Sequence, residues 1–146
     1  MAKINFKNIV TSGTDEDALT TNTAGEKLIN FGNLTTTGDL ANGIFAGADD
    51  VTIRNFASIE TSGLGGAGIY VEGANARIDN FGSIMTHGDF YEVDPDVDGD
   101  EFFPEGIFVN GDGFHIAIRQ HPRRSWVCVR HGRRRLGWRC HQHRSH

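Results

Sequence analysis

One short stretch of the sequence has the residue types and spacing that could bind a metal ion. Residues 94–105 read DPDVDGDEFFPE, which satisfies the pattern D-x-D-x-D-G-x5-E. In such a loop, carboxylates and one backbone carbonyl surround calcium, and the glycine allows the sharp bend. The pattern predicts a Ca²⁺ site made by the carboxylates of Asp94, Asp96, Asp98 and Glu105 and the carbonyl of Asp100.

This calcium motif also departs from the usual loop. No helical sequence flanks it, Glu101 stands where an aliphatic residue is usual, and Pro104 precedes the last ligand. The alternative interpretation is therefore a solvated acidic loop on the surface of the protein.

The element that must position this loop is an internal repeat with a period of 25 residues. Asn-Phe pairs begin at residues 5, 30, 55 and 80. An aliphatic residue follows each Phe three residues later, at Ile9, Leu34, Ile59 and Ile84. Thr-x-Gly triplets begin at residues 11, 36, 61 and 86, and Gly-Ile-aromatic triplets begin at 43 and 68. Several independent features thus share one register, which identifies a repeat protein.

Each repeat has short apolar alternations broken by Gly, Asn and Asp, which indicates strands and turns rather than helices. A 25-residue unit cannot bury its own apolar face, so successive units must stack. We therefore expect an all-β fold: a right-handed parallel β-helix, or solenoid, of four to five coils with a 25-residue repeat. The four aliphatic residues should point inward, and the four Asn side chains should hydrogen-bond in a column about 4.8 Å apart.

The repeat pattern N-F-G-S-I-x-T-x-G…G-I-Y-V-x-G, over residues 4–116, resembles the β-helix repeats of bacterial autotransporter passengers and large adhesins. These proteins belong to the pectate-lyase-like superfamily. The resemblance implies the fold, and it is compatible with adhesins, lyases and hydrolases.

Charge divides the chain into two parts. The β-helix domain, residues 1–117, contains an acidic insertion at about residues 89–105, and a basic tail occupies residues 118–146. The part up to residue 118 has a charge of −14 and residues 119–146 one of +9, within a total of −5. Neither cysteine lies in the β-helix domain, so the pair says little about redox compartment.

We interpret the tail as the product of out-of-frame translation after about residue 117. The repeat predicts Asn-Phe-Gly-Ser-Ile there, but the chain reads Ile118-Arg119-Gln120-His121. Codons ATT-CGG-CAA-CAT followed by C would read Phe-Gly-Asn-Ile when shifted by one nucleotide. Sequencing the gene tests this interpretation, and the alternative is a genuine basic domain.

The tail also contains residue types that bind metals and nucleic acids. Its C-x2-H…C-x2-H set, formed by Cys128, His131, Cys140 and His143, could hold zinc tetrahedrally. Its arginines and two Trp could contact phosphates and bases. If the tail is out of frame, both patterns are accidental, and we expect no specific nucleic-acid binding.

A catalytic site is not evident in the repeat. Enzymes with this fold cluster carboxylates and bases on one outer face, and the candidates here are Asp39, Asp49, Asp50, Asp79 and Asp89. A carboxylate in a repeat turn is more often a turn residue than a catalyst. His87 takes the place of Ser or Thr in the repeat, so we expect it to be merely exposed. We therefore expect no enzyme activity, and the alternative is a truncated polysaccharide-active lyase or hydrolase.

The function that the sequence favours is a structural or adhesive β-helix fragment that associates with itself. Neither end of the repeat shows a capping element, so end-to-end stacking into a homo-oligomer or fibre is expected. A glycan is the other partner considered, and no membrane span is expected because no long apolar run occurs. The expected location is secreted or at the cell surface by a route without an N-terminal signal peptide, or otherwise cytoplasmic.

Overall fold

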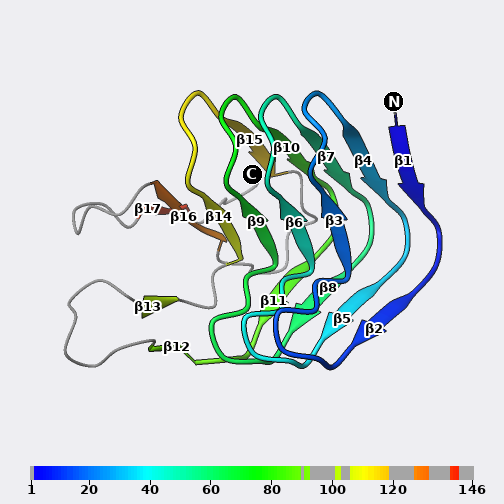
Figure 1. Cartoon of the computed structure of the whole chain (residues 1–146), viewed down its shortest axis with the longest axis vertical. Helices are drawn as coiled ribbons and strands as arrows, with labels where there is room; N and C mark the ends of the chain where they lie inside the picture. The colour runs from blue at the N-terminus through cyan, green and yellow to red at the C-terminus, as the bar shows by residue number, and fades with distance from the viewer. Residues whose placement is uncertain are drawn as a thin grey trace, which may run out of the picture.

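A computed structural model describes residues 2–89, 91–92, 101–102, 106–118, 127–131 and 139–141 of the chain, with side chains in 2–89 and 106–118. Every regular element within these residues is a β-strand. The strands form a parallel β-solenoid whose successive turns lie side by side (Figure 1). This arrangement confirms the all-β solenoid fold and the 25-residue repeat.

Three sheets run along the solenoid, and each regular turn contributes one strand to each sheet. Sheet A contains β1 (Ala2–Asn5), β4 (Lys27–Asn30), β7 (Thr52–Asn55), β10 (Arg77–Asn80) and β15 (His115–Ile118). Sheet B contains β2 (Ile9–Thr11), β5 (Leu34–Thr36), β8 (Ile59–Thr61) and β11 (Ile84–Thr86). Sheet C contains β3 (Leu19–Thr21), β6 (Ile44–Ala46), β9 (Ile69–Val71), β14 (Ile107–Val109), β16 (Val127–His131) and β17 (Arg139–His141).

The strand register follows the sequence repeat. In sheet A, Lys27 pairs with Ala2 and with Thr52, and Arg77 pairs with Thr52, so the offset is 25 residues each time. Arg77 then pairs with His115, an offset of 38 residues. The expected four to five coils are therefore about three regular turns followed by a longer turn that contains the insertion.

Two antiparallel pairs join this parallel frame. Within the longer turn, β12 (Tyr91–Glu92) pairs with β13 (Glu101–Phe102). In sheet C, β16 pairs parallel with β14 on one side and antiparallel with β17 on the other. Figure 1 shows β16 and β17 extending sheet C beyond β14.

The core is a set of aliphatic columns inside the three sheets. One column contains Leu28, Ile53 and Ile78, which are at most 1% exposed. A second, on sheet B, contains Leu34, Ile59 and Ile84, with Ile9 packed against the core in a partly buried position. This confirms that the aliphatic residues of the repeat stack inward. Each buried side chain of this size contributes roughly 1.5–3 kcal/mol by leaving water.

The repeated asparagines form a buried hydrogen-bonded ladder at the corner between sheets A and B. The Nδ2 of Asn30 donates to Oδ1 of Asn55 at 2.9 Å, and the Nδ2 of Asn55 donates to Oδ1 of Asn80 at 2.8 Å. Each Nδ2 also donates to the carbonyl two residues further along, as Asn55 does to Ala57 at 2.8 Å. The expected Asn column is therefore confirmed, and it satisfies side chains that are 0% exposed.

The Thr-x-Gly triplets close the next corner. The Thr61 hydroxyl donates to the carbonyl of Gly66 at 3.0 Å, which ties the end of β8 to the chain beyond the turn. A Cβ on Gly63 would lie 1.9 Å from the carbonyl oxygen of Gly38 in the preceding turn. Only glycine lets the stacked turns approach this closely.

Candidate functional site

The calcium motif lies outside the described residues. Its ligands Asp94, Asp96, Asp98, Asp100 and Glu105 belong to segments 93–100 and 103–105, which the structure does not describe. The described strands β12 and β13 precede and follow the segment 93–100, so four of the five residues lie between two paired strands. The calcium site stays a prediction.

The cysteine and histidine set of the tail is described only by its backbone. Cys128 in β16 lies opposite Cys140 in β17 in the antiparallel register, and His131 ends β16. The side chains of these residues, and the whole of His143, lie outside the described part of the chain. The zinc interpretation is therefore not tested.

Three of the candidate aspartates accept hydrogen bonds that hold turns together. The Oδ1 of Asp39 accepts from the backbone N–H of Leu64 at 3.0 Å. The Oδ1 of Asp49 accepts from the N–H of Ala74 at 2.8 Å. Asp50 accepts from the side chain of Asn75 at 3.2 Å. Each bond joins one turn to the next, as expected for carboxylates that serve as turn residues.

The other two candidate aspartates differ in position: Asp79 lies in a strand, and Asp89 takes the repeat position of Asp39 two turns further on. Asp79, in β10, is 4% exposed, and its Oδ2 lies 3.1 Å from Nε of Arg77 and 3.6 Å from Nε of Arg54. Asp89 follows β11 and is exposed. Among the described residues, no group of three or more His, Cys, Asp or Glu side chains could hold a metal ion. The candidate aspartates are thus distributed over a strand and several corners.

His87 lies on the outer side of sheet B. Its side chain is 47% exposed, and Nε2 lies 3.0 Å from Oε1 of Glu60 on the neighbouring turn. The expectation that His87 is exposed is therefore confirmed. Its contact with Glu60 is an exposed ion pair when the imidazole is protonated, and such pairs contribute little to stability.

The first turn presents three sheet edges together. β1, β2 and β3 each stand at the end of their sheet's strand order, so among the described strands each has a partner on one side only. Apolar side chains accompany these edges, since Phe6 and Val10 are each 73% exposed and Ile4 is 50% exposed. Unpaired strand edges with exposed apolar residues are sites where further strands add.

A polar residue stands over this end of the core. Lys3 takes the register position that Leu28 and Ile53 take in the following turns. Its Nζ donates to the carbonyl of Thr20 at 2.8 Å, from sheet A to sheet C. The first turn therefore carries one capping contact, which the sequence pattern alone did not indicate.

Phenylalanines form a ladder along the outside of one corner. Phe6, Phe31, Phe56 and Phe81 stack with centroid separations of 5.2, 4.9 and 4.7 Å and interplanar angles of 3–10°. The guanidinium of Arg54 lies 5.9 Å from the centroids of Phe56 and Phe81. Because the inner rings cover one another's faces, they stabilise the stack and do not offer a flat platform to a ligand.

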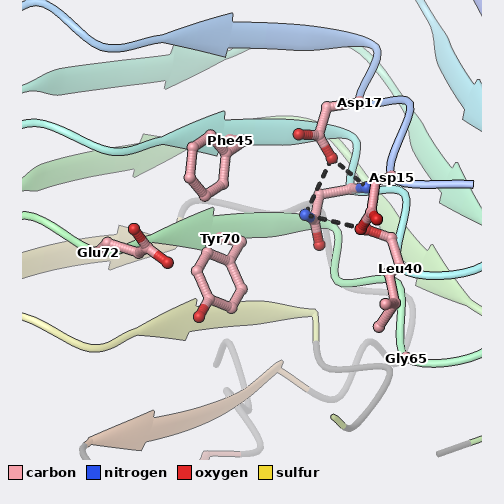
Figure 2. Close-up of a pocket in the computed structure, with 8 residues that line it drawn as sticks. Asp15, Asp17, Leu40, Phe45, Gly65, Tyr70 and Glu72 are labelled. Atoms are coloured by element: carbon pink, nitrogen blue, oxygen red, sulfur yellow. Dashed lines mark hydrogen bonds between the residues drawn. The ribbon is translucent and has the colours of Figure 1, made fainter. Parts of the chain in front are cut away.

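A concave site lies on the outer side of sheet C (Figure 2). It has a volume of about 250 Å³ and takes residues from three successive turns. The lining residues are Asp15, Asp17, Leu40, Asn42, Phe45, Gly65, Tyr70 and Glu72. Phe45 and Tyr70 occupy the middle, Glu72 lies on one side of the rings, and Asp15 and Asp17 lie on the other side.

The two aspartates of the depression differ in their surroundings. Asp15 is exposed, with φ of 56° at the turn before β3. Asp17 is half-buried, and its Oδ1 accepts from the backbone N–H of Asn42 at 2.7 Å and from Nδ2 of Asn42 at 2.9 Å. Burial raises the pKa of the Asp17 carboxyl; the bonds from Asn42 oppose the rise, and the negative charge of Asp15 adds to it.

Sequence reasoning did not single out Asp15, Asp17 or Glu72. The signal that was available is the aromatic position of the Gly-Ile-aromatic triplets, since the ring ladder of sheet C is Phe45, Tyr70 and Phe108. That position marks the outer face of the sheet. The acidic residues around it come from other positions of the repeat, so no repeated motif contains them.

The chain was compared with protein-family models, curated proteins and solved structures, and no match was found in any of the three. The described residues include no helix that is long and apolar enough to span a membrane. The features that bear on function are therefore the solenoid itself, the open edges of its first turn and the depression on sheet C.

Proposed function

We propose that this protein is a structural or adhesive β-solenoid segment that associates with a second copy of itself through its first turn. The observation that carries this proposal is the presence of three unpaired strand edges, β1, β2 and β3, in one turn. Backbone N–H and C=O groups along such edges can pair with strands of another chain. The exposed Phe6 and Val10 side chains add apolar surface to the same end.

The repeat's resemblance to autotransporter passengers and large adhesins supports a structural or adhesive role at the cell surface. In such a role the solenoid itself is the functional feature, because it spaces its outer residues at the regular separation of paired strands. The buried Asn ladder and the Phe ladder keep this spacing through the regular turns. We propose no catalytic activity for the chain.

The two ends of the solenoid are not equivalent for stacking. At the far end, sheet A ends with β15 and sheet B with β11, but β14 of sheet C already pairs with β16. Among the described strands, a second copy would meet three open edges within one turn at the first turn, whereas the terminal strands at the far end, β15, β11 and β17, belong to different layers of the stack. This difference favours contact between two first turns over head-to-tail stacking.

Contact between two first turns would be symmetric. A two-fold axis relates the same surface on both copies, and edge strands related in this way pair antiparallel. Such an interface closes after two copies, whereas head-to-tail stacking would continue as a fibre. The proposed assembly is thus a dimer.

The experiment is sedimentation velocity and light scattering of the full chain over a concentration series, with two matched variants. Val10→Lys places a charge on the open edge β2, and we expect it to shift the equilibrium to monomer. Met85→Lys makes a comparable change at the equivalent repeat position in β11, where Met85 is 52% exposed, and we expect the dimer to persist. Both substitutions add a positive charge at an exposed site.

The outcomes separate the alternatives. Loss of assembly in both variants would indicate head-to-tail stacking, because that geometry needs both ends. A monomer at all concentrations, or a dimer that neither variant disturbs, would contradict the proposal.

A further inference from the structure

The depression on sheet C has charged ends and an apolar middle. Glu72 follows β9 directly, and Figure 2 shows its carboxylate on the opposite side of Phe45 and Tyr70 from Asp15 and Asp17. The two ends are thus separated by about the length of a three-residue strand, on the order of 10 Å. A ligand that satisfies both ends must be elongated.

The negative charge of the depression determines the sign of the charge that a ligand must carry. Its three carboxylates are the charged groups among the described lining residues, and the whole chain has a net charge of −5. An anion would be repelled, whereas a cation would gain favourable interactions at both ends. The charge balance therefore favours a positively charged ligand.

A single metal ion does not fit this arrangement. No group of three or more acidic, His or Cys side chains in the described part of the chain is close enough to hold one. The carboxylates at the two ends would need separate cations, or one ligand that carries a positive charge at each end.

The aromatic rings determine which part of a ligand can lie between the two acidic ends of the depression. Tyr70 stacks between Phe45, at 5.7 Å and 24°, and Phe108, at 4.9 Å and 33°. Because both faces of Tyr70 lie against other rings, a sugar ring cannot stack on it. The ring edges and the half-buried Leu40 instead offer apolar surface suited to an alkyl chain.

We propose that this depression binds a linear polyamine, with an ammonium group at Glu72, another at the Asp15 and Asp17 carboxylates, and the alkyl chain against Phe45 and Tyr70. The volume of about 250 Å³ is below the roughly 300–1,000 Å³ of pockets for drug-sized ligands, as suits so small a molecule. Asp17 is held in place by the two bonds from Asn42. The ligand would also relieve the repulsion between Asp15 and Asp17.

The test is calorimetric titration of the full chain with spermidine, n-butylamine and arginine. Spermidine has an ammonium group at each end and a third within its alkyl chain, and butylamine has only one ammonium group. We expect saturable binding of spermidine that weakens as salt rises, and butylamine and arginine should bind at least tenfold more weakly. Equal affinity for spermidine and arginine would overturn the two-ended geometry.

Three isosteric variants locate the site. Glu72→Gln and Asp17→Asn each remove one pocket charge, and each should weaken spermidine binding about three- to fivefold, as for a partly exposed ion pair. Asp50→Asn removes one charge outside the pocket, where φ is 59° and Asn is well tolerated, and should change affinity by less than twofold. If all three variants weaken binding equally, spermidine is only screening the acidic surface, and the proposal is wrong. If the pocket variants bind as the unmodified chain does, the proposal is also wrong.

Discussion

Lys3 stands one turn before Leu28 in the same column and extends over the open end of the core to the carbonyl of Thr20, 2.8 Å from its Nζ. A charged residue at an inward position limits the addition of further strands at an edge, because burying it in a stack would desolvate the ammonium group. Lys3 thus opposes the same self-association that the exposed apolar residues of the first turn promote.

Replacing this lysine should strengthen self-association. Lys3→Leu extends the column of Leu28, Ile53 and Ile78 to the first turn, so we expect the dimer to form at least tenfold more tightly. Sedimentation equilibrium measures the change. Lys27→Leu is the control, because Lys27 is exposed in β4, inside the stack. If both leucine variants associate equally, added surface hydrophobicity is the cause and Lys3 has no special role.

The middle of the Asn ladder should be sensitive to substitution. Asn55→Ala removes the acceptor of Asn30 and the donor to Asn80 and to the Ala57 carbonyl, and leaves the side chains of Asn30 and Asn80 buried without these partners. Unsatisfied buried groups cost about 1–3 kcal/mol each, so we expect a loss of roughly 3 kcal/mol or more in the free energy of unfolding. Urea unfolding followed by far-ultraviolet dichroism measures it.

The control for the ladder is Asn33→Ala. Asn33 is exposed and accepts from the N–H of Ser58 at 3.2 Å, where water can take its place. We expect this variant to lose no more than about 1 kcal/mol. Similar losses in the two variants would mean that the buried ladder has no special energetic role.

Asp17 should make the solenoid's stability depend on pH in the acid range. Burial raises the pKa of this carboxyl in the folded state, so the folded chain binds the Asp17 proton more tightly than the unfolded chain does. The resulting contribution to the free energy of unfolding is fully present below the ordinary pKa of an aspartate. The contribution is lost as the pH rises through the raised folded-state pKa. Asp17→Asn removes this dependence while it keeps an oxygen acceptor for Asn42.

The measurement is the difference in unfolding free energy between Asp17→Asn and the unmodified chain from pH 3 to pH 7. We expect the variant to become more stable relative to the unmodified chain as pH rises. A difference that stays constant, or that moves toward the unmodified chain, would contradict the assigned direction of the pKa shift.

The acidic insertion should bind calcium weakly, with a dissociation constant on the order of 10⁻⁴ M, as in extracellular sites without a rigid frame. At a free calcium concentration 50 times this value, mass action adds about 2.3 kcal/mol to the free energy of unfolding. Thermal melts with calcium and with chelator measure the effect. The double variant Asp96→Ala with Asp98→Ala should have the same melting temperature with calcium and with chelator. A calcium effect of equal size in that variant would exclude the loop as the calcium-binding site.

The fold could be predicted from the repeat pattern, because the stacking of turns is one-dimensional. Once the Asn-Phe pairs repeat every 25 residues, each residue of a turn lies against its equivalent in the next. The inward column of Leu34, Ile59 and Ile84 and the Asn30–Asn55–Asn80 ladder follow directly, and both are present. The contact between Asn55 and Asn80 can be predicted from the 25-residue offset alone.

Contacts between non-equivalent positions of the repeat could not be predicted in this way. Asp17 comes from the first turn and Tyr70 and Glu72 from the third, at different places in the repeat, and their approach depends on how the corners turn the chain around sheet C. Lys3 likewise reaches Thr20 across the cross-section of the turn rather than along a column. A linear register specifies neighbours along the solenoid axis, but contacts around and across each turn depend on the geometry of the corners. One example is the positive φ of 56°, 57° and 67° at the equivalent positions Asp15, Leu40 and Gly65, whose residue types differ.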